Sequence, residues 1–364
     1  MKKMIYHIPY FVDKNRQSGS HIRPFKMLNA FKNIGYEVDV VMGYGESRKK
    51  SITEIKKNIE NGVKYDFCYS ESSTMPTLLT EENHLPKYPF LDFGFFKFLK
   101  QHNIKIGLFY RDCYWLFEEG TKSVSDFKKK VSNFFYRYDL KKYPEFLDVF
   151  YLPTLLMKDY IPMNFNGKYE ALPPGIDSSL QEETLSVNQE NTLKLFYVGG
   201  IGPMYKMDTL LKVVSETENI KLVLCCRESE WNAEKPRLSK YLNDNIEIIH
   251  KSGVEYKEDI ETSDIASVFF EQSEYRKFAM SVKLFEYLAY NKPVLSVTNT
   301  AVGQFVEEYN IGWNVSYDEN ELKNLLIKLR DNKKEIENKA NNIADALQEN
   351  TWEARARKVS KDLT

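Results

Sequence analysis

The chain has 364 residues, of which 42% are hydrophobic, 28% are charged and 14% are aromatic, and its formal net charge is −1. This composition excludes disordered and fibrous classes, and at roughly 150 residues per domain the length predicts two domains. No apolar run reaches the roughly 18 residues of a membrane-spanning helix. The four cysteines show no CxxC or zinc-ligand spacing, which fits a reducing cytosol.

The first half of the chain alternates short β-type runs with helical patterns of apolar residues. Strands are expected at 4–8, within 35–45, and at 65–69, 105–111 and 149–152, and helices at 22–34 and 91–100. Such β-α-β alternation predicts a parallel sheet covered by helices.

A second domain of the same kind is expected after a proline-containing linker at 171–180. Its strands are expected at 193–198, 221–226, 246–249, 266–270 and 293–297, and its helices at 208–217, 282–290, 319–331 and 334–349. The sequence therefore predicts an α/β protein with two Rossmann-like domains, 1–171 and 172–350. Ligands of such sheets bind outside the carboxyl ends of the strands.

A glycine-rich turn, GGIGPMYK at 199–206, follows the first expected strand of the second domain. Gly199 and Gly200 would let the backbone approach a phosphate at a helix N-terminus, and Lys206 would supply a full charge. A dinucleotide fingerprint requires glycine where Tyr205 stands, so NAD binding is poorly supported, and no P-loop lysine follows. Tight strand-to-helix packing is an equally good explanation of the glycines.

A helix expected from residue 281 carries the second candidate group of residues. The amides of Ser281 and Val282 could face an anion at its start. Glu286, one turn further on, could accept hydrogen bonds from ribose hydroxyls. The alternative for Glu286 is an ordinary solvated glutamate.

The segment VKLFEYLAYNKPVLS at 282–296, preceded by LFYVGG and LPPGID, resembles the GT-B nucleotide-sugar glycosyltransferases, family 4 (group 1). The resemblance implies two Rossmann-like domains facing each other across a cleft. It implies that Glu286 binds the donor ribose and that Lys206 contacts the donor diphosphate. It also implies that the last segment, 351–364 with Trp352, crosses back to the N-terminal domain.

Two positions depart from the family pattern. The family's arginine after the V-G pair falls on Gly200, and the acid expected eight residues before Glu286 falls on Phe278. Arg227 is a candidate replacement for the missing cation, and Glu274 or Arg276 could enter the site from a neighbouring loop.

The N-terminal domain offers candidate acceptor-side residues. The GSHIR turn at 19–23 is similar to the acceptor loop of the GT-B fold, and Asp13 lies in the same expected loop. In an inverting enzyme, Asp112 or His21 would be the base that deprotonates the acceptor hydroxyl. In a retaining enzyme, which the resemblance implies, these residues would position substrates instead. A buried Arg111–Asp112 network is the structural alternative.

No metal site or cofactor is expected. The chain lacks the D-x-D sequence that metal-dependent GT-A enzymes use, and its five histidines never fall at ligand spacing. The predicted enzyme is therefore a metal-independent glycosyltransferase of EC 2.4 type.

Two stretches, 88–100 and 126–143, combine aromatic residues with lysines and arginines. Such surfaces suit an anionic membrane face, whereas core packing with a solvated lysine face is the alternative. Nucleic-acid binding is not supported, because no recognition motif accompanies the charge. We expect a cytoplasmic protein that contacts the inner face of the membrane.

Together these features predict a transferase that moves a sugar from a nucleoside diphosphate sugar to a glycan or lipid-linked glycan. The implied setting is capsule, O-antigen or exopolysaccharide synthesis in bacteria. Two alternatives remain open: a non-catalytic partner subunit of a glycosyltransferase, and a nucleotide-sugar epimerase on the same fold.

Overall fold

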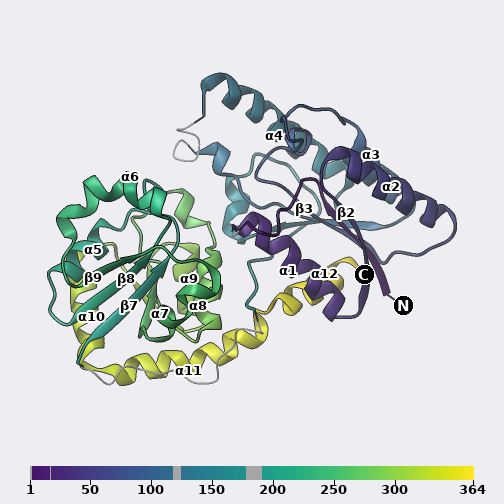
Figure 1. Cartoon of the computed structure of the whole chain (residues 1–364). Coiled ribbons are helices and arrows are strands. Elements are labelled where there is room, and N and C mark those ends of the chain that lie inside the picture. The colour runs from purple at the N-terminus through teal and green to yellow at the C-terminus, as the bar shows by residue number, and fades with distance from the viewer. Residues whose placement is uncertain (1, 17, 118–123, 178–190) are drawn as a thin grey trace. The chain divides into compact units, whose positions relative to one another are not determined.

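The computed structural model describes residues 2–16, 18–117, 124–177 and 191–364 (Figure 1). The chain divides into two compact units. Met1–Gly175 and Trp352–Thr364 form the N-terminal unit, and Ile176–Thr351 form the C-terminal unit. Each unit has its own six-stranded sheet and its own apolar core.

All strands of the N-terminal unit run parallel, in the order β2-β1-β3-β4-β5-β6. They are β1 (Lys2–Ile8), β2 (Tyr36–Met42), β3 (Phe67–Glu71), β4 (Lys105–Phe109), β5 (Val149–Leu152) and β6 (Lys168–Ala171). Because β2 and β3 lie on opposite sides of β1, the strand order reverses between β1 and β3.

Helices cover both faces of this sheet. They are α1 (Gly19–Asn33), α2 (Gly45–Glu60), α3 (Leu91–Gln101), α4 (Asp126–Phe146) and α12 (Trp352–Leu363), with short 3₁₀ turns at Thr77–Leu79, Tyr114–Leu116 and Leu155–Tyr160. Side chains of a strand alternate between faces. Accordingly Tyr6 packs against Phe31 of α1, whereas the next residue, His7, packs against Phe96 of α3.

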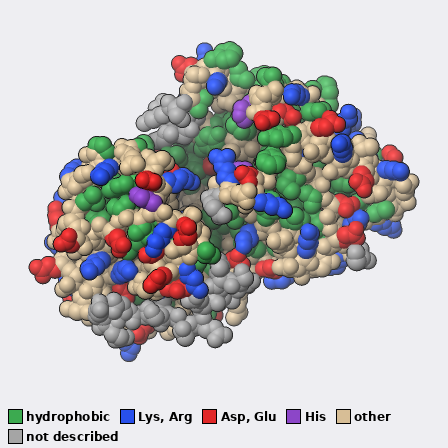
Figure 2. All heavy atoms as spheres, in the orientation of Figure 1, with side chains coloured by type: hydrophobic (Ala, Val, Ile, Leu, Met, Phe, Trp, Pro, Cys, Tyr) green, Lys and Arg blue, Asp and Glu red, His purple; other side chains and the backbone are tan. Residues whose placement is uncertain are grey.

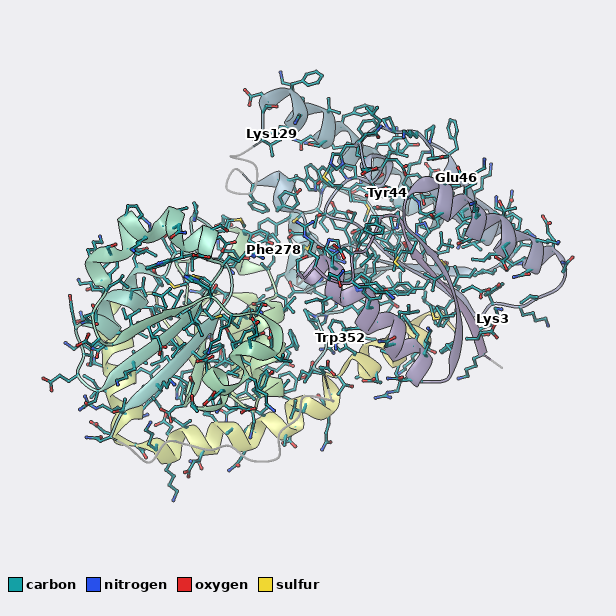
Figure 3. The ribbon with its side chains drawn as sticks, viewed as in Figure 1. Lys3, Tyr44, Glu46, Lys129, Phe278 and Trp352 are labelled. Atoms are coloured by element: carbon teal, nitrogen blue, oxygen red, sulfur yellow. The ribbon has the colours of Figure 1, made fainter. Side chains whose placement is uncertain are left out.

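Helix α12 belongs to the N-terminal unit although it ends the chain. Asn33 donates a hydrogen bond to Glu353 at 2.8 Å, and the hydroxyls of Tyr36 and Ser360 lie 2.7 Å apart. A Cβ on Gly175 would lie 2.6 Å from the backbone nitrogen of Trp352, at the start of α12 (Figure 3). Only glycine allows this close approach.

The sheet of the C-terminal unit is also entirely parallel, in the order β12-β11-β10-β7-β8-β9. Its strands are β7 (Leu193–Val198), β8 (Ile220–Cys225), β9 (Ile246–Ile249), β10 (Ile265–Ser267), β11 (Val294–Val297) and β12 (Gly312–Val315). The order reverses between β7 and β10, which makes this pair the expected ligand-binding edge.

Seven helices are described in this unit. They are α5 (Asp208–Ser215), α6 (Glu228–Leu238), α7 (Lys257–Glu261), α8 (Val282–Ala289), α9 (Ala301–Glu308), α10 (Glu319–Asp331) and α11 (Lys333–Glu349), with 3₁₀ turns at Ser239–Tyr241, Gly253–Tyr256 and Tyr275–Lys277. The predicted fold class, α/β with two Rossmann-like parallel sheets, is confirmed.

Candidate active site

The loops that follow β7 and β10 meet at the point where the strand order reverses. The Glu271 amide donates to the Lys206 carbonyl at 2.9 Å, and the Lys206 ammonium lies 2.7 Å from the Glu271 carboxylate. Both side chains are about half exposed, at 49% and 48%. The hydrogen bond that its ammonium donates to the Glu271 carboxylate raises the pKa of Lys206, so the lysine is a cation at neutral pH.

Two glycines of the glycine-rich turn have structural reasons, one of packing and one of backbone conformation. A Cβ on Gly199 would lie 2.5 Å from the Tyr197 hydroxyl, which donates to the Gly200 carbonyl. Gly202 has a φ of +123°, a conformation that other residues rarely adopt. The turn nevertheless presents an amide to an anion, because the Ile201 amide donates to the Glu230 carboxylate at 3.1 Å.

Arg227 precedes α6 and forms an ion pair with Glu230. Glu230 therefore stands between the Arg227 guanidinium and the Ile201 amide of the turn. This arrangement links Arg227 to the glycine-rich turn through a carboxylate rather than directly.

Helix α8 begins where the sequence predicts. Ser281 is its N-cap, and its hydroxyl accepts from the Lys283 amide at 3.3 Å. Val282 is the first helical residue. The Glu286 carboxylate accepts from the Tyr256 hydroxyl and from the Lys283 ammonium, the latter at 2.8 Å.

The Glu286 side chain is 22% exposed, so solvent and ligands can reach it. Its contact with the Tyr256 hydroxyl is the kind of bond that a ribose hydroxyl would offer. The adjacent Tyr287 hydroxyl accepts from the Val198 amide at 3.0 Å. This bond connects α8 to the end of β7, one residue before the glycine-rich turn.

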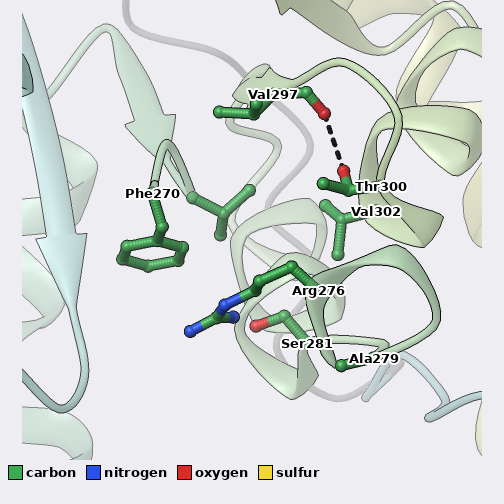
Figure 4. A pocket seen from close by; sticks show the side chains of 8 residues that line it. Phe270, Arg276, Ala279, Ser281, Val297, Thr300 and Val302 are labelled. Carbon is green, nitrogen blue, oxygen red and sulfur yellow. Dashed lines mark hydrogen bonds between the residues drawn. The ribbon is translucent and has the colours of Figure 1, made fainter. Parts of the chain in front are cut away.

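Arg276 enters the same region from the turn Tyr275–Lys277. Its guanidinium donates to the Met204 carbonyl at 2.5 Å and lies over the ring of Tyr205. It lines a small pocket beside Ser281 (Figure 4). The other lining residues are Val268, Phe270, Ala279, Val297, Thr300 and Val302.

Phe278, eight residues before Glu286, belongs to the core of this region. It is 1% exposed and packs against the Tyr275 ring (Figure 3). Glu274, in contrast, forms an exposed ion pair with Lys277. Of the two residues expected to enter from this loop, Arg276 therefore lies on the glycine-rich turn.

The corresponding edge of the N-terminal unit holds a buried ionic network around Glu71, the last residue of β3. Its carboxylate pairs with Arg111 at 3.1 Å and with Arg23 at 3.3 Å. Glu71 is 0% exposed. Burial and the Glu71 carboxylate raise the pKa of Tyr6, whose hydroxyl donates to Glu71. The structural alternative, a buried Arg111–Asp112 network, names the wrong acid, because Arg111 pairs with Glu71.

Arg111 also fixes the start of α1. It donates to the Gly19 carbonyl at 3.2 Å and to the Tyr10 hydroxyl at 3.0 Å. Tyr10 in turn donates to the Ser20 carbonyl at 3.0 Å. The network thus holds the GSHIR turn against the carboxyl ends of β3 and β4.

His21 and Asp112 are both partly buried. The His21 Nδ1 accepts from the Asp13 amide at 2.9 Å, and burial together with Arg16 lowers the pKa of His21. The neutral ring therefore carries its proton on Nε2, which can donate a hydrogen bond but cannot take a proton. One Asp112 oxygen accepts from the Tyr114 amide at 2.9 Å.

Sequence reasoning missed four side chains at these edges: Glu71, Glu230, Tyr256 and Glu271. None of them lies in a motif, and each is defined by its contact with a residue distant in sequence. Glu71 carries the one signal that was available, since an acidic residue that ends an apolar strand is unusual.

Among the described residues, no three His, Cys, Asp or Glu side chains are placed to hold a metal ion. In the same residues, no helix has the length and apolar character that crossing a bilayer requires.

Residues 181–347 match the family model described as glycosyl transferases group 1. Similar solved structures include sucrose-phosphate synthase from Thermosynechococcus elongatus, with a TM-score of 0.64 at 14% identity over 99% of this chain and 98% of that one. Anabaena HepE in complex with UDP-glucose gives 0.63 at 11% identity over 100% and 99%. WaaG, a glycosyltransferase involved in lipopolysaccharide biosynthesis, gives 0.59 at 13% identity over 99% and 100%.

A comparison with curated protein sequences found no match. The structural similarity extends over both units, whereas the sequence similarity to the family lies in the C-terminal unit. The chain therefore has the GT-B fold that its sequence predicts, and residues 181–347 are similar to the glycosyl transferases group 1 family.

Proposed function

We propose that this protein transfers a sugar from a nucleoside diphosphate sugar to a hydroxyl group of a glycan acceptor. The observation that carries the proposal is the position of Glu286. Its carboxylate accepts a hydrogen bond from the Tyr256 hydroxyl, and the next residue, Tyr287, is bonded to the end of β7. Lys206 lies at the same edge, and a ligand could replace its half-exposed partner, Glu271. The similar HepE structure holds UDP-glucose, which supports a donor of this class.

In the proposed reaction the bond between the anomeric carbon and the diphosphate oxygen breaks, and the nucleoside diphosphate leaves with the electron pair. The acceptor oxygen forms the new bond, and in a retaining transfer its proton passes to the leaving diphosphate. Lys206 and the amides of Ser281 and Val282 would stabilise the charge on the leaving diphosphate. We propose a metal-independent, retaining transfer in which His21 donates a hydrogen bond from Nε2. An inverting transfer would leave Asp112 as the base.

Donor binding and turnover test the proposal together. Titration calorimetry with UDP, GDP, ADP, CDP and dTDP should identify one diphosphate that binds. Replacement Glu286→Gln should weaken that binding by roughly tenfold or more, because the lost charge-assisted bonds are worth roughly 1.5–3 kcal/mol. The matched control is Glu335→Gln, whose 21% exposed carboxylate also pairs with a lysine but lies outside the loops after β7 and β10.

Turnover of the matching nucleotide sugar separates the three functional classes. A transferase releases the diphosphate slowly even without its proper acceptor, with water accepting the sugar. A partner subunit binds without release, and an epimerase alters the sugar. If none of the five diphosphates binds to the folded protein, the proposal is refuted.

We further propose that the acceptor is a lipid-linked glycan at an anionic bilayer surface, in a polysaccharide-assembly pathway. The supporting feature is the first half of α4. Phe127, Val131 and Phe134 are 77%, 37% and 65% exposed, and their spacing of four and three residues places them on one helix face. Figure 2 shows hydrophobic side chains beside basic ones over this part of α4.

The basic residues of α4 match an anionic surface. Lys128, Lys130 and Arg137 are exposed, and the described residues place no carboxylate in ion-pair contact with them. The other aromatic stretch behaves differently, because Phe93, Phe95 and Phe96 of α3 are buried in the core. The prediction that residues 88–100 contact a membrane is therefore wrong for these three rings. Helix α4, in contrast, has one buried face and one exposed face.

Cosedimentation with phosphatidylcholine vesicles, with and without phosphatidylglycerol, tests this surface. Binding should require the anionic lipid and should fall by roughly tenfold or more in Phe127→Ser/Phe134→Ser, because burial of one such ring contributes roughly 1.5–3 kcal/mol. The control is Phe90→Ser, which changes an 81% exposed ring outside α4. Equal binding of the double variant and the wild type would exclude α4 as the contact.

A further inference from the structure

In the glycosyltransferases that the sequence resembles, an arginine follows the V-G pair of this turn, whereas this chain has Gly200 there. The donor's diphosphate carries two negative charges that the site has to balance. Three nearby cations are already paired with carboxylates: Lys206 with Glu271, Arg227 with Glu230, and Lys283 with Glu286. The source of the missing charge is therefore a specific question for this chain.

Arg276 differs from these three cations. Across the described residues, no carboxylate lies within ion-pair distance of its guanidinium, whose hydrogen-bond partner is the neutral Met204 carbonyl. An arginine remains protonated at any physiological pH. Arg276 therefore brings a full positive charge to the glycine-rich turn without a carboxylate to neutralise it.

Two aromatic rings hold this guanidinium in place. Its central carbon lies 4.5 Å from the Tyr205 ring centre and 4.6 Å from the Phe270 ring centre. Cation–π contacts of this kind favour a positively charged side chain. They restrain the plane of the guanidinium but use none of its N–H groups, so within the described part of the chain only the bond to Met204 occupies a donor.

The position of Arg276 suits a phosphate ligand. Tyr205, on which it lies, approaches Gly200 closely, since a Cβ added to Gly200 would lie 3.3 Å from the Tyr205 ring. The guanidinium also lines a pocket with Ser281, the N-cap of α8 (Figure 4). A phosphate there would meet a planar donor group beside a hydroxyl and the first amides of a helix.

We propose that Arg276 binds the diphosphate of the donor and supplies, from the loop after β10, the charge that is absent at Gly200. This inference rests on the proposed function. A guanidinium can contact two phosphate oxygens at once, which a lysine ammonium at the same place cannot do with equal geometry. Arg276 is thus a diphosphate-binding residue, and Tyr205 and Phe270 position it.

The test compares the affinity for a nucleoside diphosphate with the affinity for its nucleoside, using the base identified in the titrations above. Arg276→Gln should weaken diphosphate binding by roughly tenfold or more and leave nucleoside binding within about twofold, because bonds to a charged group contribute roughly 1.5–3 kcal/mol. The diphosphate affinity of Arg276→Lys should lie between those of the wild type and Arg276→Gln, since lysine keeps the charge but loses the planar, two-pronged geometry of the guanidinium.

The control is Arg330→Gln, which replaces an arginine that pairs with Asp331. Arg330 donates to a backbone carbonyl, that of Glu218, at 2.9 Å, but it lies on α10, outside the two loops. Its replacement should leave both affinities unchanged. Melting curves of all variants monitor folding, and the ratio of the two affinities is insensitive to a uniform loss of folded protein.

The outcomes distinguish the inference from the proposed function. Wild-type binding of a diphosphate with an unchanged affinity ratio in Arg276→Gln would overturn the role of Arg276 and leave the proposed function intact. An equal loss of diphosphate and nucleoside affinity would assign Arg276 a structural role and also overturn the inference. Absence of diphosphate binding by the wild type would refute the proposed function itself.

Discussion

The two units carry charged groups at equivalent edges of their sheets but hold them in different ways. In the N-terminal unit, Glu71 is fully buried between Arg111 and Arg23. In the C-terminal unit, Lys206 and Glu271 form a pair in which each side chain is about half exposed. One edge is a buried network, and the other is a set of accessible pairs.

This difference means that the buried network stabilises the fold, whereas the exposed pairs can exchange a partner for a ligand. Removing one partner of a buried ion pair leaves an uncompensated charge and costs roughly 3–5 kcal/mol, whereas an exposed pair contributes roughly 0–1 kcal/mol. A diphosphate could therefore displace Glu271 from Lys206 at little cost. The Glu71 network instead keeps the GSHIR turn in one position.

The largest effect on stability is expected at Glu71. Replacement Glu71→Gln leaves Arg111 and Arg23 without their buried counter-charge and should lower the free energy of unfolding by about 3 kcal/mol. Urea denaturation followed by circular dichroism at pH 7 measures the change. The control, Glu37→Gln, removes an exposed partner of Lys3 and should cost less than about 1 kcal/mol. Equal effects of the two replacements would contradict the comparison.

A pH-dependent effect of the opposite sign is expected at Asp139 on α4. This carboxyl is buried and accepts from the Thr77 amide at 2.7 Å, and its second oxygen has no hydrogen-bond partner among the residues that the structure describes. Burial raises the pKa of Asp139 to about 7. The folded protein therefore keeps this proton over a range in which the unfolded chain has lost it.

Stability should consequently fall as the pH rises from about 4 to about 7, with a limiting slope of about 1.4 kcal/mol per pH unit, and this cost should remain at higher pH. Asp139→Asn removes the ionisation, so it should raise stability at pH 8 and flatten this part of the profile. The exposed Asp345→Asn on α11 should keep the wild-type profile. Melting temperatures between pH 5 and 8 provide the measurement, and an unchanged slope in Asp139→Asn would contradict the assignment.

The sequence predicted the elements with strong local patterns. The expected strand at 193–198 matches β7 in both ends, and the expected helix at 319–331 matches α10. The predicted strand ends were less accurate at the candidate functional edges. The strand expected at 105–111 ends at Phe109, because the Arg111 side chain pairs with Glu71. When a charged residue is buried by partners that are distant in sequence, no local sequence pattern predicts it.

The same limit applies to the candidate site. Glu286, Lys206 and Ser281 could be predicted as candidate residues because a motif and a helix start mark them. Whether Arg227 or Arg276 contacts the glycine-rich turn depends on how two loops meet in space, which spacing along the chain does not determine. The structure pairs Arg227 with Glu230 and places Arg276 on Tyr205.

The smallest effect on stability, with a clear effect on binding, is expected at Lys206. Lys206→Ala breaks a half-exposed pair, so the free energy of unfolding should change by less than about 0.5 kcal/mol. The control, Lys212→Ala, breaks a pair with Glu319 of similar length and exposure and should behave alike in urea.

The two variants should differ in calorimetry with the diphosphate. Lys206→Ala should bind roughly tenfold more weakly, because it loses a charge-assisted bond, and Lys212→Ala should bind as the wild type does. A large loss of stability in Lys206→Ala would show that this edge, like that of Glu71, is a structural network, and the contrast between the two units would fail.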